Sequence, residues 1–188
     1  ARSKEIADKL IERIEWWKWY ASVFGGELDN NPTVGNKAGG LTTIAEKSLG
    51  AVAKGGTTVL VDVYQYAEPV TAKGFVIMDT PGYDPPSVTG MVAGGANVVV
   101  FTPGRGTTIG NAICPVLKLA SNTPVFERMP DDIDLDAGPI IDGTETIPQV
   151  GQRVFDRVVE VASGQKLAHA EIHKHREFQI WAEQSVSL

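Results

Sequence analysis

Short runs of apolar, mostly β-branched residues alternate with helix-like segments along this chain, and this alternation constrains the fold more than any other feature. Four runs are typical of buried strands, at residues 57–64, 74–80, 97–102 and 116–120. Helical spacing predicts helices at residues 1–24, 44–53, 87–94 and 148–163. Strands that alternate with helices favour parallel pairing. We therefore expect an α/β fold, a three-layer, mainly parallel Rossmann-like sheet with flanking helices.

Composition excludes several classes of protein. The chain has 188 residues and a formal net charge of -6, whereas a broad nucleic-acid interface needs a basic surface. No apolar run approaches the ~20 residues of a membrane span. A single cysteine, Cys114, cannot form a disulfide framework. These features predict a cytoplasmic protein with neither a nucleic-acid partner nor a membrane partner.

Three segments are expected from the pattern of residues. Residues 1–28 form an amphipathic, aromatic-rich helix, residues 29–164 an α/β domain, and residues 165–188 a mixed polar and aromatic tail. The aromatic end of the helix, which includes Trp16 and Trp19, is expected to pack against another domain or subunit, with a sugar-stacking platform as the alternative. The helical start predicts a fragment of a longer polypeptide, linked to upstream domains.

A glycine-flanked arginine follows the third apolar run. Gly104-Arg105-Gly106 comes just after Thr102, where the strand is expected to end. Ligands of open α/β sheets bind at the carboxyl ends of the strands, and arginine suits bidentate recognition of a carboxylate or phosphate. The alternative is a surface turn in which Arg105 pairs with a nearby aspartate.

Two further polar loops lie at predicted strand ends. If the strands at 74–80, 97–102 and 116–120 are parallel in one sheet, their loops share an edge. That edge would gather a cation pair, an acid and a phenol: Tyr83, Asp84, Arg105, Lys118 and Asn122. The alternatives are that Asp84 caps the following helix and that Lys118 is an exposed strand residue.

Other motifs give weaker signals. The chain has no G-x-x-x-x-G-K-[ST], no helix-opening G-x-G-x-x-G and no G-x-S-x-G. His169 and His173 have the i, i+4 spacing that can bind a metal on a helix, but a solvated helix face is the more common use of that spacing. The acidic group at 131–136 lacks the pattern of an EF-hand and favours a solvated turn.

Three long blocks resemble the altronate/galactarate dehydratase family, from about Asn31 to the end of the chain. They are NPTVGNKAGGLTTIAEKSLGAVAKGGTT, PGYDPPSVTGMVAGGANVVVFTPGRGTT and LKLASNTPVFERMPDDIDLDAGPIIDGTETI. The resemblance implies the C-terminal part of a longer enzyme, a hydro-lyase that removes water from a hexarate or hexonate such as galactarate or altronate. It also implies a divalent metal, ferrous iron, with ligands largely outside this chain, and a homo-oligomer.

On this basis we expect proton transfer by Lys37, Tyr83 and Asp84. Substrate contacts are expected from a larger set: Asn31, Asn36, Thr102, Gly104, Arg105, Gly106, Lys118 and Asn122. The metal ligands are not identified by the sequence. The isolated chain is expected to be inactive.

Departures from the family pattern bear on the substrate. Pro103 stands where the family has Thr in FTTGRG, and Ala137 stands where the family has Cys in Asn-Cys-Gly. Pro86 replaces a small aliphatic residue. Three alternatives stay open: a non-catalytic structural or dimerisation domain, a sulfolactate sulfo-lyase-type carbon–sulfur lyase, and a Rossmann-like nucleotide binder.

Overall fold

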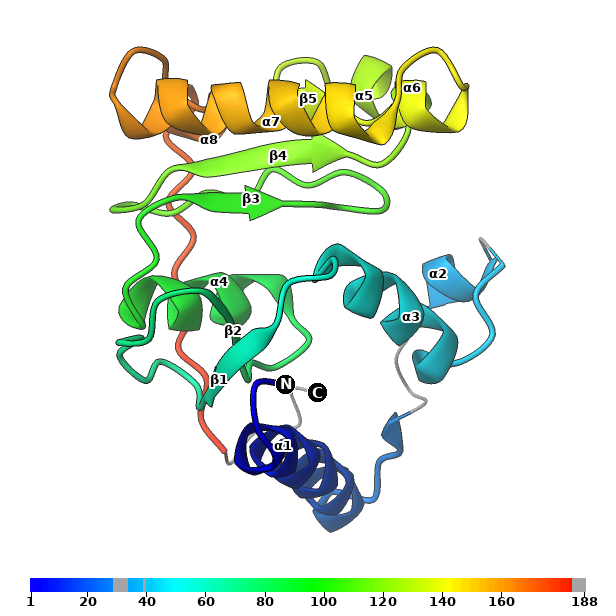
Figure 1. Cartoon of the computed structure of the whole chain (residues 1–188). Coiled ribbons are helices and arrows are strands. Elements are labelled where there is room, and N and C mark those ends of the chain that lie inside the picture. The colour runs from blue at the N-terminus through cyan, green and yellow to red at the C-terminus, as the bar shows by residue number, and fades with distance from the viewer. Residues whose placement is uncertain (29–33, 39, 184–188) are drawn as a thin grey trace. The chain divides into compact units, whose positions relative to one another are not determined.

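The computed structural model describes residues 1–28, 34–38 and 40–183 (Figure 1). The chain divides into two compact units, which are described separately. The first contains residues 1–83 and those from Trp181 onward, and the second contains Asp84–Ile180. The division after Tyr83 falls inside the segment 29–164 that the sequence analysis treats as one domain.

The described part of the first unit contains three helices and two strands: α1 (Lys4–Val23), α2 (Val34–Ala38), α3 (Ile44–Lys54), β1 (Leu60–Tyr64) and β2 (Phe75–Met78). Strands β1 and β2 are parallel and form a sheet of two strands. Ser3 begins α1, because its side chain accepts a hydrogen bond from the backbone of Ile6. Lys9 on α1 pairs with Asp62 on β1 over 2.9 Å, which ties the helix to the sheet.

The aromatic end of α1 packs within its own unit. The ring of Trp16 stacks on Tyr20 with centroids 4.9 Å apart, and Trp181 contacts both rings from the far end of the chain. Trp17 donates a hydrogen bond to Asp79 over 2.6 Å. Burial raises the pKa of Asp79, although the Trp17 N–H and Arg13 act in the opposite direction. Trp19 stays largely exposed.

The second unit contains five helices and three strands: α4 (Asp84–Ala93), β3 (Val99–Phe101), β4 (Val116–Ala120), α5 (Thr123–Arg128), β5 (Leu135–Asp136), α6 (Gly138–Ile141), α7 (Ile147–Ala162) and α8 (His169–Ile172). The strands form a parallel sheet in the order β3-β4-β5. β5 lies in the acidic group at 131–136, for which the sequence analysis favours a solvated turn.

Helices cover both faces of this sheet (Figure 1). On one face Leu117 packs with Val158 and Val161 of α7. On the other, Val116 packs with Val88 of α4 and with Val99. Helix α7 begins with a capping box between Thr146 and Gln149 and is the best-formed helix of the unit.

The α/β prediction with parallel strands is confirmed, but the prediction that the strands form one sheet is wrong. β2 pairs with β1 in the first unit, whereas β3, β4 and β5 form a separate sheet. The connection from β3 to β4 also contains no helix, unlike the alternation of a doubly wound sheet. No helix within the described residues is both long and apolar enough to cross a membrane.

Candidate functional site at the carboxyl edge of the second sheet

The carboxyl ends of β3, β4 and β5 lie at one edge, because all three strands are parallel neighbours. Three polar segments leave this edge: residues 102–108 after β3, residues 121–122 before α5, and Ala137-Gly138 at the start of α6. Ligands of parallel sheets bind at such an edge. It is therefore the candidate site.

Arg105 lies exposed in the loop after β3. Its backbone carbonyl accepts a hydrogen bond from Nη2 of Arg128 on α5, over 2.9 Å. Its own guanidinium makes no hydrogen bond or ion pair with any residue that the structure describes. The turn therefore presents a cation to solvent, and the alternative in which Arg105 pairs with an aspartate finds no partner in the described ranges.

The two glycines beside Arg105 have different environments. Gly106 has a φ of 92°, and a Cβ at this position would collide with Sδ of Met129. At Gly104 a Cβ would meet no atom within 4 Å. Only Gly106 is thus required by the backbone and by the close approach of α5.

Asn122 begins α5 at the end of β4. Its side-chain oxygen accepts a hydrogen bond from the backbone of Val125 over 3.0 Å, and its amide nitrogen donates to Ser121 Oγ over 3.3 Å. Both ends of the amide are therefore used in the turn. In this structure Asn122 acts as a helix cap, which limits what it can offer to a substrate hydroxyl.

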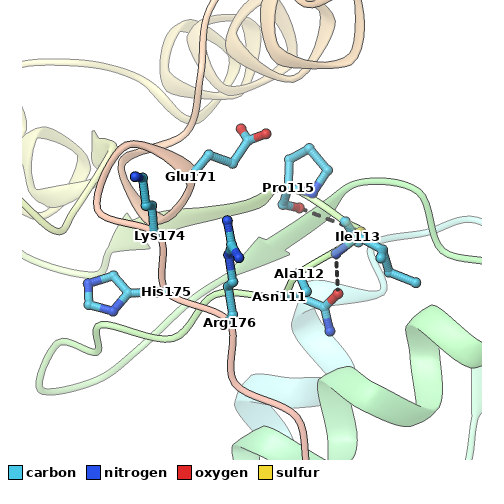
Figure 2. A pocket seen from close by; sticks show the side chains of 9 residues that line it. Asn111, Ala112, Ile113, Pro115, Glu171, Lys174, His175 and Arg176 are labelled. Atoms are coloured by element: carbon cyan, nitrogen blue, oxygen red, sulfur yellow. Dashed lines mark hydrogen bonds between the residues drawn. The ribbon is translucent and has the colours of Figure 1, made fainter.

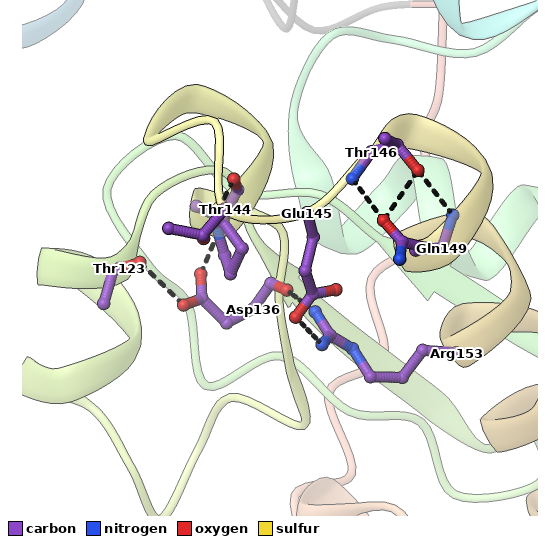
Figure 3. Close-up of polar contacts among 9 residues, drawn as sticks. Thr123, Asp136, Thr144, Glu145, Thr146, Gln149 and Arg153 are labelled. Atoms are coloured by element: carbon purple, nitrogen blue, oxygen red, sulfur yellow. Dashed lines mark hydrogen bonds and ion pairs between the residues drawn. The ribbon is translucent and has the colours of Figure 1, made fainter.

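A polar network that the sequence analysis did not single out fixes the β5 end of the edge (Figure 3). The carboxylate of Asp136 accepts hydrogen bonds from Thr123 Oγ1 and from the backbone of Gly138, each over 2.8 Å. Arg153 on α7 donates to the carbonyl of Asp136 over 2.7 Å and pairs with Glu145 over 2.6 Å. The order Thr-Pro after β4 and Asp-x-Gly after β5 is a turn signal that could have indicated this network.

Lys118 lies in the middle of β4 and is fully buried. The alternative that it is an exposed strand residue is therefore wrong. Its ammonium donates a hydrogen bond to the carbonyl of Ile109 over 3.4 Å, and its backbone N–H donates to Asp134 Oδ2 over 2.8 Å. Burial lowers the pKa of Lys118, while the charges of Asp134, Asp132 and Glu177 act to raise it.

Acidic and imidazole groups surround this lysine. His175 lies between Asp132, at 3.7 Å, and Glu177, at 3.8 Å. Glu177 is held by the backbone of Gly110 over 2.8 Å, and Asp134 by that of His169, also over 2.8 Å. Sequence spacing gives no sign of this cluster, because its members come from four separate segments.

The sequence analysis expects a divalent metal, and the described His, Cys, Asp and Glu side chains can be checked as its ligands. His169 begins α8 and His173 follows its last residue. Within residues 1–28, 34–38 and 40–183, no group of three or more His, Cys, Asp or Glu side chains is arranged to hold a metal ion. These residues thus do not fit a metal site by themselves.

The remaining predicted residues are distributed over both units. Asn36 and Lys37 lie on α2, and Tyr83, which is 56% exposed, ends the first unit. In the second unit, Asp84 is the first residue of α4 and Thr102 directly follows β3. Asn31 lies outside the described residues. Because β2 is not in the second sheet, strand pairing does not bring Tyr83 to the candidate edge.

Comparisons with known proteins place the chain in a family. Residues 1–186 match the family described as D-galactarate/Altronate dehydratase, C-terminal. The galactarate dehydratase (L-threo-forming) of Escherichia coli (strain K12) is 39% identical over 166 residues, which are 88% of this chain and 32% of that protein. An altronate dehydratase of Bacillus subtilis (strain 168) is 35% identical over 169 residues, 90% of this chain and 34% of that protein.

A third relative is named differently. The (2R)-sulfolactate sulfo-lyase subunit beta of Chromohalobacter salexigens is 36% identical over 151 residues, which are 80% of this chain and 39% of that protein. The chain thus spans about a third of the length of the curated dehydratases it matches. It belongs to the D-galactarate/altronate dehydratase C-terminal family.

Proposed function

We propose that this chain is the C-terminal domain of a hydro-lyase that removes water from a hexarate or hexonate, such as galactarate or altronate. The observation that carries the proposal is family membership over residues 1–186, together with relatives named as dehydratases of these two sugar acids. The carboxyl edge of the second sheet supports it, since Arg105 is exposed there on a turn anchored by α5.

In the proposed reaction a base removes the proton next to the substrate carboxylate, and an acid assists loss of the β-hydroxyl as water. Arg105 holds the carboxylate through paired N–H donors, which also stabilises the charge that develops on it. Thr102 and Gly104 belong to the same loop as Arg105. Lys37, Tyr83 and Asp84 stay our candidates for proton transfer.

Lys118 has a different part in this proposal. Because its ammonium is fully buried and donates to the carbonyl of Ile109, Lys118 does not meet a substrate at the exposed edge in this structure.

Ferrous iron is proposed as the cofactor of the whole enzyme, with ligands mostly outside the described residues. Since the described donors do not form a site for it, no step is assigned to a metal on this chain. A cytoplasmic location and a homo-oligomer also remain proposals.

Carbon–sulfur cleavage is the second candidate, favoured by the sulfo-lyase subunit among the relatives. Loss of sulfite from the carbon β to a carboxylate needs the same base and the same carboxylate clamp. The chemistry at the leaving group then separates the two candidates.

The test is an assay of the full-length enzyme, supplied with ferrous iron, on galactarate, altronate and sulfolactate. A keto acid formed from either sugar acid supports the dehydratase, and sulfite released from sulfolactate supports the second candidate. Turnover of none of the three, with metal bound, overturns both. Arg105→Gln is compared with Lys73→Gln, an exposed lysine of the first unit, and only the former should lower kcat/KM.

A further inference from the structure

An open pocket of about 290 Å³ lies at the amino end of β4, away from the candidate site (Figure 2). One wall is Asn111–Pro115, the segment that directly precedes β4. The other comes from α8 and the residues after it, with Glu171, Lys174, His175 and Arg176 lining the space. All of these residues belong to the second unit.

Close packing fixes the two walls against each other. The backbone N–H of Gly110 donates to Glu177 over 2.8 Å, and a Cβ on Gly110 would collide with the carbonyl oxygen of His175. The backbone N–H of His175 donates to Ala170 over 2.9 Å. Lys174 takes a left-handed φ of 60°, uncommon for a residue other than glycine, which turns the chain at the pocket. The pocket is therefore preorganised by the backbone.

The polar side chains that line this pocket are mainly hydrogen-bond donors. Arg176 extends into the space between the walls (Figure 2), and neither it nor Lys174 forms a side-chain hydrogen bond or ion pair with the described part of the chain. Asn111 Oδ1 already accepts from the backbone of Ile113 over 3.0 Å, which leaves the amide N–H groups as donors.

The carboxylates in and near the pocket already have contacts within the chain. Glu171, which also lines the pocket, accepts a hydrogen bond from the backbone of Ala168 over 2.8 Å. Asp132 and Glu177 lie beside His175. The lining carries two permanent cations, Lys174 and Arg176, against one carboxylate, Glu171. This positive lining contrasts with the net charge of -6 on the whole chain.

We propose that this pocket binds a small oxyanion, a carboxylate or phosphate group, through Arg176, Lys174 and the amide of Asn111. The guanidinium supplies two parallel N–H donors to one anionic group, and the ammonium adds a second charge. Carboxylate and phosphate oxygens accept such bonds in the same way, so the residues define the ligand by this shared chemistry.

The pocket is distinct from the proposed substrate site. The five residues of β4 separate the two edges of the sheet by roughly 13 Å. A six-carbon sugar acid, with five carbon–carbon bonds of about 1.5 Å each, spans less than about 8 Å. One substrate molecule cannot occupy both, so this is a second binding site whose test does not depend on turnover.

The test measures binding of malonate and of inorganic phosphate to the full chain by calorimetry, at constant ionic strength set with chloride. We expect one or both anions to bind, and the double variant Lys174→Asn with Arg176→Gln to weaken binding by roughly tenfold or more. Asparagine tolerates the left-handed backbone at position 174, which protects the fold. Lys73→Gln, which removes an exposed lysine of the first unit, is the matched control and should leave this binding unchanged.

A second variant tests the sign of the charge. Glu171→Gln keeps an oxygen for the Ala168 N–H but removes a negative charge from the lining, so it should tighten binding. Malonate alone or phosphate alone would identify the source of the oxyanion. No binding of either anion, or equal binding by the double variant, overturns the proposal.

Discussion

Lys118 and Arg105 are both cations that the sequence suggests as carboxylate ligands, yet the molecule places them in opposite surroundings. Lys118 stands in the middle of β4 and is fully buried, with Asp132, Asp134 and Glu177 near its ammonium, whereas Arg105 stands in solvent on the turn after the neighbouring β3. The pKa of the lysine is lowered because burial outweighs the nearby carboxylates. Within the described residues, the arginine is hydrogen-bonded through its backbone carbonyl and not through its guanidinium.

The difference separates two uses of a positive charge. A buried ammonium costs stability unless it is well paired. An exposed guanidinium costs little and is free to meet a ligand. The four predictions below test this contrast, and each changes one of the two regions.

The largest expected effect follows truncation of Lys118. Lys118→Ala removes a fully buried stem, and the cavity should lower the free energy of unfolding by about 2–4 kcal/mol. Lys118→Met keeps the stem and removes the charge, so it should cost much less. Urea denaturation of both variants measures the difference, and equal losses would show that the charge, not the packing, is what matters.

The second largest loss of stability is expected from substitution of a glycine beside Arg105. Gly106→Ala forces a side chain onto a φ of 92° and against Met129, and should lower the free energy of unfolding by about 1–2 kcal/mol. Gly104→Ala is the matched control, since its Cβ meets open space, and should change stability by less than about 0.5 kcal/mol. If the two variants were alike, the turn would not be held by α5 as described.

This pair also shows how far the sequence could be interpreted. The pattern G-R-G correctly indicates a turn at a strand end, but it cannot tell which glycine is required. That depends on Met129, which the fold brings from α5. Likewise β5 was missed because Leu135 and Asp136 are too few to show a strand pattern.

Long-range pairing accounts for the other errors. The run at 74–80 is a strand as predicted, but nothing local says that its partner is β1 and not β3. Lys118 reads as exposed because strands often alternate polar and apolar residues. Apolar residues on both faces were the available signal that β4 is covered on both sides: Val116 and Ala120 on the face of Lys118, and Leu117 and Leu119 on the opposite face.

The third prediction concerns pH. The folded-state pKa of Lys118 lies below its ordinary value of 10.5, so between these two values the unfolded chain binds more protons than the folded chain. The contribution of Lys118 to stability should therefore rise with pH across that interval. The measurement is the free energy of unfolding of the wild type minus that of Lys118→Met, because other titrating groups cancel in the difference. A flat difference would contradict the lowered pKa.

The smallest expected change in stability is that of Arg105→Gln. Its guanidinium has no partner among the described residues, and the carbonyl that binds Arg128 is kept, so the free energy of unfolding should change by less than about 0.5 kcal/mol. In the full-length enzyme the same variant should lower kcat/KM by about 10- to 100-fold. This fold-change corresponds to the free energy of one lost charge-assisted hydrogen bond. A stable but impaired variant would set Arg105 apart from Lys118 as a ligand-binding cation. A clear loss of stability with unchanged kinetics would reverse that assignment, because the guanidinium would then serve the fold.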